Sequence, residues 1–136
     1  MKKKYDLKVF KVENHDTEPA LLIVFDSSVG VDLTLIVAQN VYSASDTFPF
    51  VALQKIRRVL EESGELLCCA GGRIDVHPSG RMLVGFNAYK LIKGQPVKKG
   101  SVVSIFKVED DILALGTVQE QDDFYAEWLE SLNPNS

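Results

Sequence analysis

Apolar and polar residues alternate along the first part of the chain, and this pattern predicts strands. Residues 5–12 place apolar side chains at nearly every second position, between lysines and an aspartate, which is typical of a half-buried strand. Residues 20–26 (ALLIVFD) are mostly aliphatic and β-branched, which predicts a more buried strand. Residues 31–38 alternate again after a turn signal at 27–30, so we expect them to form a hairpin with the second strand.

The clearest predicted element is an amphipathic helix between Asp46 and Gly64. Asp46 is a favourable N-cap, Pro49 suits a first helical turn, and Gly64 stands where a C-terminal glycine belongs. Apolar residues recur at helical spacing at Phe50, Leu53, Ile56, Val59 and Leu60, whereas Lys55, Arg57, Arg58, Glu61 and Glu62 occupy the other side. We therefore expect this helix to pack on a sheet, with Arg57 and Arg58 each in reach of a glutamate one turn later.

Shorter apolar runs follow the helix and predict further strands. Residues 65–70 (ELLCCA) predict a buried strand, and residues 86–92 alternate as a half-buried strand does. The loop predicted between them, residues 73–82, contains strong turn chemistry. The run 101–108 predicts another strand, with a short helix as the alternative, and 112–118 suits either a strand or a connecting segment.

The end of the chain predicts a short helix. Its apolar residues recur at helical spacing: Phe124, Trp128 and Leu132. Asp122 or Asp123 is the expected cap, and residues 133–136 are the expected frayed end. The order of elements predicts an α+β fold with a mainly antiparallel sheet, one amphipathic helix packed on a face and a short C-terminal helix. At 136 residues the chain has the size of a single domain, 1–136.

Charge is divided unevenly along the chain. The sequence holds 15 Lys and Arg against 19 Asp and Glu, a formal charge of −4. After Lys107 there is no Lys or Arg, but eight acids follow: Glu109, Asp110, Asp111, Glu120, Asp122, Asp123, Glu127 and Glu130. The last part therefore carries −8 and residues 1–107 carry +4. This balance argues against nucleic-acid binding and against a disordered acidic chain.

The apolar and cysteine patterns predict a cytoplasmic protein with no membrane association. No apolar run approaches the ~20 residues that cross a bilayer, and polar residues interrupt every run that would form a signal peptide. The two cysteines, Cys68 and Cys69, are adjacent, and such pairs rarely bridge each other, so we expect two buried thiols. With only two histidines and no C-x-x-C spacing, we expect no metal and no cofactor.

The N-terminal lysines form a basic edge at residues 2–4, continued by Lys8 and Lys11. We interpret this edge as a solvated strand whose lysines oppose aggregation between sheets. The absence of interleaved aromatic residues argues against a nucleic-acid groove.

Residues 69–80 (CAGGRIDVHPSG) hold the densest set of reactive side chains. Asp75, His77 and Ser79 stand two apart, which places them on one face of an extended strand. Their Cβ atoms would be ~6–7 Å apart, two rises of ~3.3 Å, so a local catalytic triad is disfavoured. We expect Asp75 to cap backbone N–H groups or to pair with Arg73, and Ser79 to make a turn bond.

The glycine pair Gly71-Gly72 before Arg73 has two interpretations. Exposed glycine N–H groups with an adjacent guanidinium can form an anion cradle. Alternatively, the glycines permit a bulge or a close crossing of two backbone segments.

Residues 67–106 resemble a family of small uncharacterised bacterial proteins. The first part of the family pattern is matched by Cys69, Gly71, Arg73, Asp75, Val76, Pro78, Ser79 and Gly80. The second part is matched by Gly85, Ala88, Tyr89, Gly94, Pro96, Ile105 and Phe106. The chain departs from the pattern at Ala70, Gly72, Arg81, Val84 and Phe86. The resemblance implies a small cytosolic bacterial protein and carries no known reaction; its departures imply that any binding by the glycine-rich stretch is altered.

Together these features favour a non-enzymatic protein-binding module. Proteins of this size and acidity are often immunity proteins, which bind and neutralise a toxin, and an acidic end suits a basic partner. The candidate surfaces are the loop 73–80 and the acidic end. Phe124 and Tyr125 at that end are further candidate anchors, with burial of Phe124 and Trp128 in the terminal helix as the alternative. The candidate binding residues are Arg73, Asp75, His77, Ser79, Tyr89 and Trp128.

Two other hypotheses stay open at this point. One is a small enzyme or an anion- or ligand-binding domain centred on residues 69–80, which requires Cys69 and the reactive side chains after it to converge on one pocket. The other is a structural homo-oligomer in which an edge strand pairs across a two-fold axis.

Overall fold

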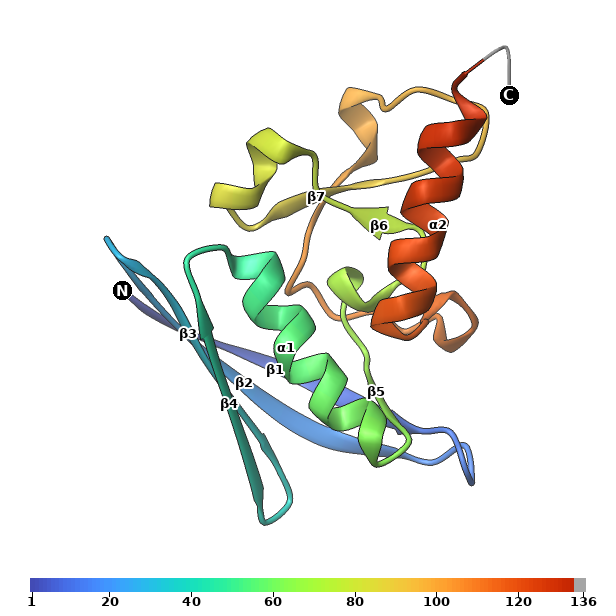
Figure 1. The fold of residues 1–136 in the computed structure, drawn as a ribbon. Coiled ribbons are helices and arrows are strands. Elements are labelled where there is room, and N and C mark those ends of the chain that lie inside the picture. The colour runs from blue at the N-terminus through green and yellow to red at the C-terminus, as the bar shows by residue number, and fades with distance from the viewer. Residues whose placement is uncertain (134–136) are drawn as a thin grey trace.

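A five-stranded antiparallel sheet forms one layer of the molecule (Figure 1). The computed structural model describes residues 1–133, so most of the frayed end expected at 133–136 lies outside the described residues. The strands are β1 (Lys2–Lys11), β2 (Thr17–Ser27), β3 (Gly30–Val37), β4 (Asn40–Asp46) and β5 (Glu65–Leu67), in the order β4-β3-β2-β1-β5. The predicted hairpin of the second and third strands is confirmed, with Val24 opposite Leu33.

The helix α1 (Pro49–Glu62) packs on one face of this sheet, as the sequence predicts. Alternate residues of β2 and β3 meet Leu53, Ile56 and Leu60 in the core, because side chains two apart on a strand share a face. Val59, expected on the apolar side, is 44% exposed. Gly64 follows the helix with φ of 70°, the conformation expected of a C-terminal glycine.

The helix start differs from the prediction by two residues. Phe48 is the N-cap, and Asp46 accepts a 2.9 Å hydrogen bond from its N–H. Asp46 therefore closes the turn before α1 instead of capping the helix itself. That bond lowers the pKa of Asp46 below its ordinary value, and Lys55 adds to the effect.

The second half of the chain forms a small sheet and a terminal helix. The small sheet has the order β6-β7-β8, with β6 (Val76–His77), β7 (Asn87–Lys90) and β8 (Val102–Ser104). Within residues 1–133 there are four 3₁₀ helices: η1 (Ala70–Gly72) before β6, η2 (Gly80–Val84) between β6 and β7, η3 (Lys99–Ser101) between β7 and β8, and η4 (Ile112–Ala114) before the last helix. The helix α2 (Val118–Ser131) lies beside β6 and contacts α1. The expected α+β class is confirmed, with a mainly antiparallel sheet, one helix on its face and one C-terminal helix.

Several boundaries differ from those that the sequence predicts. β4 was not expected, β5 stops at Leu67, and the run 101–108 is a strand only over β8. For segment 112–118 the sequence allowed either a strand or a connecting segment, and the structure shows a connecting segment that contains η4. α2 begins earlier than expected, because Thr117 and Glu120 form a reciprocal capping box that replaces Asp122 or Asp123 as the cap. Both helices are too short and too polar to span a membrane in the described part of the chain.

Candidate functional site

The segment after β5 packs closely against α1, and its two glycines, Gly71 and Gly72, make this close packing possible. A Cβ on Gly71 would lie 2.5 Å from Leu53 Cδ2. A Cβ on Gly72 would lie 2.6 Å from the carbonyl oxygen of Leu67. Since real Cβ atoms do not approach other atoms so closely, any side chain at either position would displace its neighbours. The close-crossing interpretation of the glycine pair is therefore confirmed.

The same glycines have no free donors for an anion. The N–H of Gly71 donates to Ile105, and the N–H of Gly72 donates to Cys69. The N–H of Arg73 also bonds within the segment, to Ala70. The backbone of residues 71–73 is thus occupied by its own fold, and it lacks the outward N–H groups that a cradle needs.

Arg57 on α1 is buried beside this crossing, with 2% of the residue exposed. Its Nη1 donates to the Gly71 carbonyl (3.1 Å) and to Oε1 of Gln121 on α2 (2.6 Å). Its Nη2 donates to the Gly116 carbonyl at 2.9 Å. The prediction that Arg57 lies on the polar side of the helix is wrong, because its partners come from distant parts of the chain. Burial lowers the pKa of Arg57 below its ordinary value.

Gln121 completes this buried network, and none of its surface is exposed. Its Nε2 donates to the carbonyls of Gly71 and Arg73, both at 2.8 Å. The amide of Gln121 therefore accepts a hydrogen bond at its oxygen and donates from both of its N–H groups. We call Arg57 and Gln121 together the buried bracket, since they tie α1, the glycine crossing and α2 to one another.

Arg73 forms an ion pair with Asp75, which is one of the two roles expected for Asp75, and Glu109 joins it. Its Nε and Nη2 donate to the two carboxylate oxygens of Asp75 at 2.8 and 3.0 Å, and its Nη1 donates to Glu109 at 2.9 Å. The hydrogen bond with Asp75 raises the pKa of Arg73, against the effect of burial. Burial alone would raise the pKa of Glu109, but its hydrogen bonds from Arg73 and Asp111 lower it overall.

The wall around this ion-pair cluster carries mixed charge. Arg73 lines a hollow of about 310 Å³ together with Lys90, Lys107, Glu109 and Asp110. Since the guanidinium of Arg73 already faces two carboxylates, it has little capacity left to bind a further anion. Cys69, His77 and Ser79 do not line this hollow.

His77 lies in a separate cluster of aromatic rings. Its ring is stacked on Tyr125 of α2 with centroids 3.7 Å apart and planes 6° apart, and Phe50 of α1 meets it edge-on at 5.1 Å. Its Nδ1 is 2.8 Å from the Pro78 carbonyl, and its Nε2 is 4.0 Å from Asp122. Burial lowers the pKa of His77, although Pro78 and Asp122 act in the opposite direction. The imidazole therefore packs β6 between two helices.

Two other sequence-predicted residues lie at the margin of this aromatic cluster. Ser79 precedes η2 but makes no side-chain cap bond to it, so the expected turn bond is not formed there. Tyr89 on β7 lies opposite His77 in the register of the small sheet, and its side chain is half-buried. Neither residue joins Arg73 and Asp75 in a hydrogen bond of the described chain.

Both cysteines are buried free thiols, as the sequence predicts. Burial raises the pKa of Cys68 and of Cys69 to about 11. Because the thiolate is the nucleophilic form, a thiol with so high a pKa is unreactive near neutral pH. The hypothesis of a site built around Cys69 therefore lacks its nucleophile.

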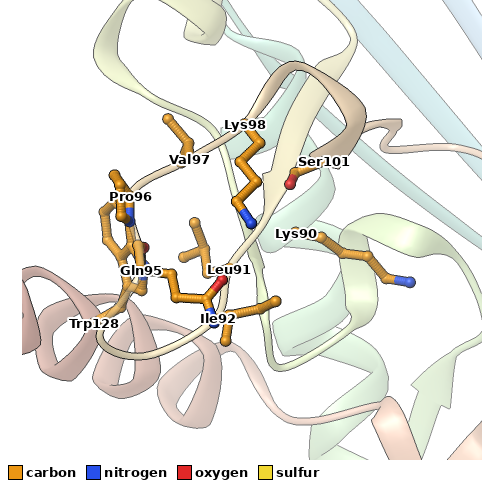
Figure 2. A pocket seen from close by; sticks show the side chains of 9 residues that line it. All are labelled: Lys90, Leu91, Ile92, Gln95, Pro96, Val97, Lys98, Ser101 and Trp128. Carbon is orange, nitrogen blue, oxygen red and sulfur yellow. Dashed lines mark hydrogen bonds between the residues drawn. The ribbon is translucent and has the colours of Figure 1, made fainter.

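Trp128 connects α2 to the loop that follows β7. Figure 2 shows its side chain reaching the loop that carries Gln95 and Pro96. Its indole N–H donates to the Gln95 carbonyl at 2.9 Å, and the residue is only 7% exposed. The hollow between them measures about 10 Å³, room for about one water molecule. In this arrangement Trp128 packs the helix against the loop, and no space for a ligand separates them.

The outward side of α2 is acidic. Glu120, Asp123, Glu127 and Glu130 are all exposed, and their spacing places them within about 80° of arc around the helix. We call Glu120, Asp123, Glu127 and Glu130 the acidic stripe. The buried residues of α2 lie on the opposite side: Val118, Gln121 and Trp128. Lys93 meets the acidic stripe at Glu127, with 2.7 Å between Nζ and Oε1.

Comparison with known proteins adds no assignment. Neither the models of known protein families nor the curated protein sequences contain a match to this chain. The resemblance of residues 67–106 to a bacterial family stays a prediction. Within residues 1–133, no group of three or more His, Cys, Asp or Glu is arranged to hold a metal ion.

Proposed function

We propose that this protein is a non-enzymatic binding module for a basic protein, and that it acts as an immunity-type protein that neutralises a toxin. The observation that carries the proposal is the acidic stripe on α2. It concentrates the excess negative charge of the chain on one exposed helix side. The proposal includes a cytoplasmic location in a bacterium, which the resemblance of residues 67–106 suggests.

The acidic stripe suits recognition of a basic surface for electrostatic reasons. Charges of one sign gathered on one side of a molecule attract an oppositely charged partner over about a Debye length and increase the rate of encounter. Leu129 is 48% exposed and Leu132 37%, but helical spacing places both on the side of the helix away from the stripe. The acidic stripe therefore supports the proposal through its charge alone.

The alternative of an enzyme or anion site at residues 69–80 receives less support. The Arg73 guanidinium is engaged by Asp75 and Glu109, and His77 is enclosed by rings on another side of β6. Cys69 is fully buried with a raised pKa. A catalytic nucleophile needs a base within hydrogen-bond reach, and these groups lie in separate clusters.

Affinity capture from the source bacterium tests the proposal. The bait is the wild-type protein, the stripe variant Asp123→Asn with Glu127→Gln, or a control with Glu13→Gln and Glu62→Gln. Both variants remove two exposed negative charges, but only the first changes α2. We expect a basic protein to be retained at low salt by the wild type and the control, and to be lost at high salt and with the stripe variant.

The toxin part of the proposal needs a second measurement. The retained protein is expressed in a surrogate bacterium with and without this chain, and growth is followed. We expect growth arrest that the wild type and the control relieve and the stripe variant relieves less. Retention of no partner at either salt, or retention that the stripe variant does not alter, would overturn the binding proposal. A partner that leaves growth unaffected would overturn the immunity role alone.

A further inference from the structure

The N-terminal half of β1 has an unpaired edge. β5 pairs with only the last three residues of β1, and Lys8 then accepts a hydrogen bond from the N–H of Cys68. Backbone groups alternate in direction along a strand, so Asp6, Lys4 and Lys2 direct their N–H and C=O to the same side as Lys8. Within residues 1–133, no backbone hydrogen bond reaches these three residues from that side. Three donors and three acceptors are therefore available in a row.

A hollow of about 220 Å³ lies beside the same stretch of β1. Its apolar wall is formed by Tyr5, Val24 and Phe86, and Lys3 and Asp26 also line it. Tyr5 lies on the core side of the strand, because it is two residues from the buried Leu7. A strand placed along the open edge would thus direct every second side chain to the face of the sheet on which this hollow lies.

Lysines stand on both faces of the open edge. Lys2 and Lys4 extend from the face opposite the hollow and have no ion pair within the described chain, and Lys3 lies over the Tyr5 ring at 5.8 Å. The acids nearby are Asp6 on the outer face and Asp26 at the hollow. Opposite charges on directly facing residues stabilise a strand pair, and like charges destabilise it. The outer positions of an added strand therefore favour acidic side chains.

We propose that the open edge of β1 binds an extended acidic segment of a partner protein as an additional strand. Acidic residues of that segment face Lys2 and Lys4, and the apolar residue between them enters the hollow at Tyr5 and Phe86. Strand addition of this kind takes affinity from main-chain hydrogen bonds and specificity from pockets for alternate side chains. The surface lies on β1, away from the acidic stripe, so this inference goes beyond the proposed function.

A second copy of this chain is a poorer occupant than an acidic segment. Pairing two copies of β1 in antiparallel fashion around the centre of the open edge brings Lys4 opposite its own equivalent and Lys2 opposite Asp6 of the other copy. The Lys2–Asp6 pairs are favourable, but residues 2–6 still carry +2 in each copy, so the interface keeps an excess of positive charge with two lysines facing each other at its centre. Charge complementarity thus selects an acidic segment from another protein.

The test uses a short fluorescent peptide in which glutamate alternates with valine, and a matched peptide with lysine in place of glutamate. Fluorescence anisotropy measures their binding to the wild type and to Lys4→Pro and Lys4→Gln. Both substitutions remove the charge, but only proline removes the N–H that faces the open edge, and proline is tolerated where that N–H faces solvent. We expect the glutamate peptide to bind, Lys4→Gln to weaken it a few-fold, and Lys4→Pro to weaken it about tenfold or more.

Two controls keep the test decisive. Circular dichroism checks that Lys4→Pro is folded; if it is not, a glutamate peptide N-methylated on the residues that face β1 replaces it and is expected to lose binding. Arg58→Glu reverses an exposed charge on α1 and is expected to leave binding unchanged. Equal binding of the lysine and glutamate peptides, equal effects of Lys4→Pro and Lys4→Gln, or no binding at all would overturn the proposal. So would sedimentation showing a dimer that Lys4→Pro dissociates and Lys4→Gln does not, because a second copy would then occupy the edge.

Discussion

Arg57 on α1 and Gln121 on α2 are joined by a 2.6 Å hydrogen bond between Nη1 and Oε1, and neither side chain has appreciable contact with solvent. The two residues are 64 positions apart in the sequence. A cation in the core is held here by neutral oxygens, from one amide and two backbone carbonyls. The bracket therefore depends on every acceptor staying in place, because removing either residue leaves polar atoms buried without a partner.

Disruption of this bracket is expected to destabilise the fold strongly. Arg57→Met removes the side-chain donor of the Gly116 carbonyl and one of the two donors of the Gly71 carbonyl, which should lower the free energy of unfolding by about 2–4 kcal/mol. Urea unfolding followed by circular dichroism measures the change. The neighbouring Arg58→Met is the matched control, since Arg58 is exposed and should change stability by about 0.5 kcal/mol or less. Equal effects of the two substitutions would contradict the structural role of Arg57.

The glycine crossing makes a second prediction. Gly72→Ala places a methyl group 2.6 Å from the Leu67 carbonyl oxygen, so the backbone must move. We expect a loss of about 1–3 kcal/mol in the free energy of unfolding. Gly80→Ala meets nothing within 4 Å and should be tolerated. Thermal unfolding of both variants gives the comparison, and a Gly72→Ala protein as stable as Gly80→Ala would be inconsistent with this close approach.

Stability is expected to fall in mildly acidic solution because of His77. Its pKa in the folded protein is lowered by burial below the ordinary value of 6.5. The unfolded chain therefore binds a proton first as the pH falls, and the stabilisation present above pH 6.5 is lost between that value and the lowered pKa. Unfolding at about pH 7.5 and about pH 5.5 should show the loss. His77→Gln should reduce this dependence; a pH profile that the substitution leaves unchanged would refute the assignment.

The thiols should be protected in the native state. Cys68 and Cys69 are buried and have pKa values raised to about 11, so a thiolate-directed reagent meets little of its reactive form near neutral pH. Mass spectrometry after iodoacetamide treatment should find native protein largely unmodified and urea-unfolded protein modified at both positions. Rapid labelling of the native protein would show that the segment after β5 opens more easily than its packing indicates.

Local patterns predicted most of the fold. The alternation in β2 and β3 and the signals at Pro49 and Gly64 located the hairpin and α1, because these elements are determined by nearby residues. β4 escaped detection because its outward positions hold small polar residues such as Ser43 and Ser45, as an edge strand allows. The start of α2 was detectable, since Thr117 and Glu120 have the spacing of a capping box.

The candidate site was harder to predict, because its contacts join distant segments. The pair of Arg73 with Asp75 is local and was predicted, but Glu109 comes from 36 residues later. The spacing of Arg57, four residues after Leu53, was a signal for burial, yet only the position of Gln121 explains how a charge is accommodated there. The stacking of His77 on Tyr125 likewise depends on where α2 packs, which no local pattern specifies.

The buried bracket also sets an order for synthesis on the ribosome. The five-stranded sheet and α1 are complete in sequence by Leu67, but the guanidinium of Arg57 has no side-chain partner until residue 121 has been made. In a chain interrupted between these points, Arg57 is left to water and the side of α1 that packs against α2 stays uncovered. We therefore expect premature termination products to be less stable than the full chain and to be cut more readily by proteases.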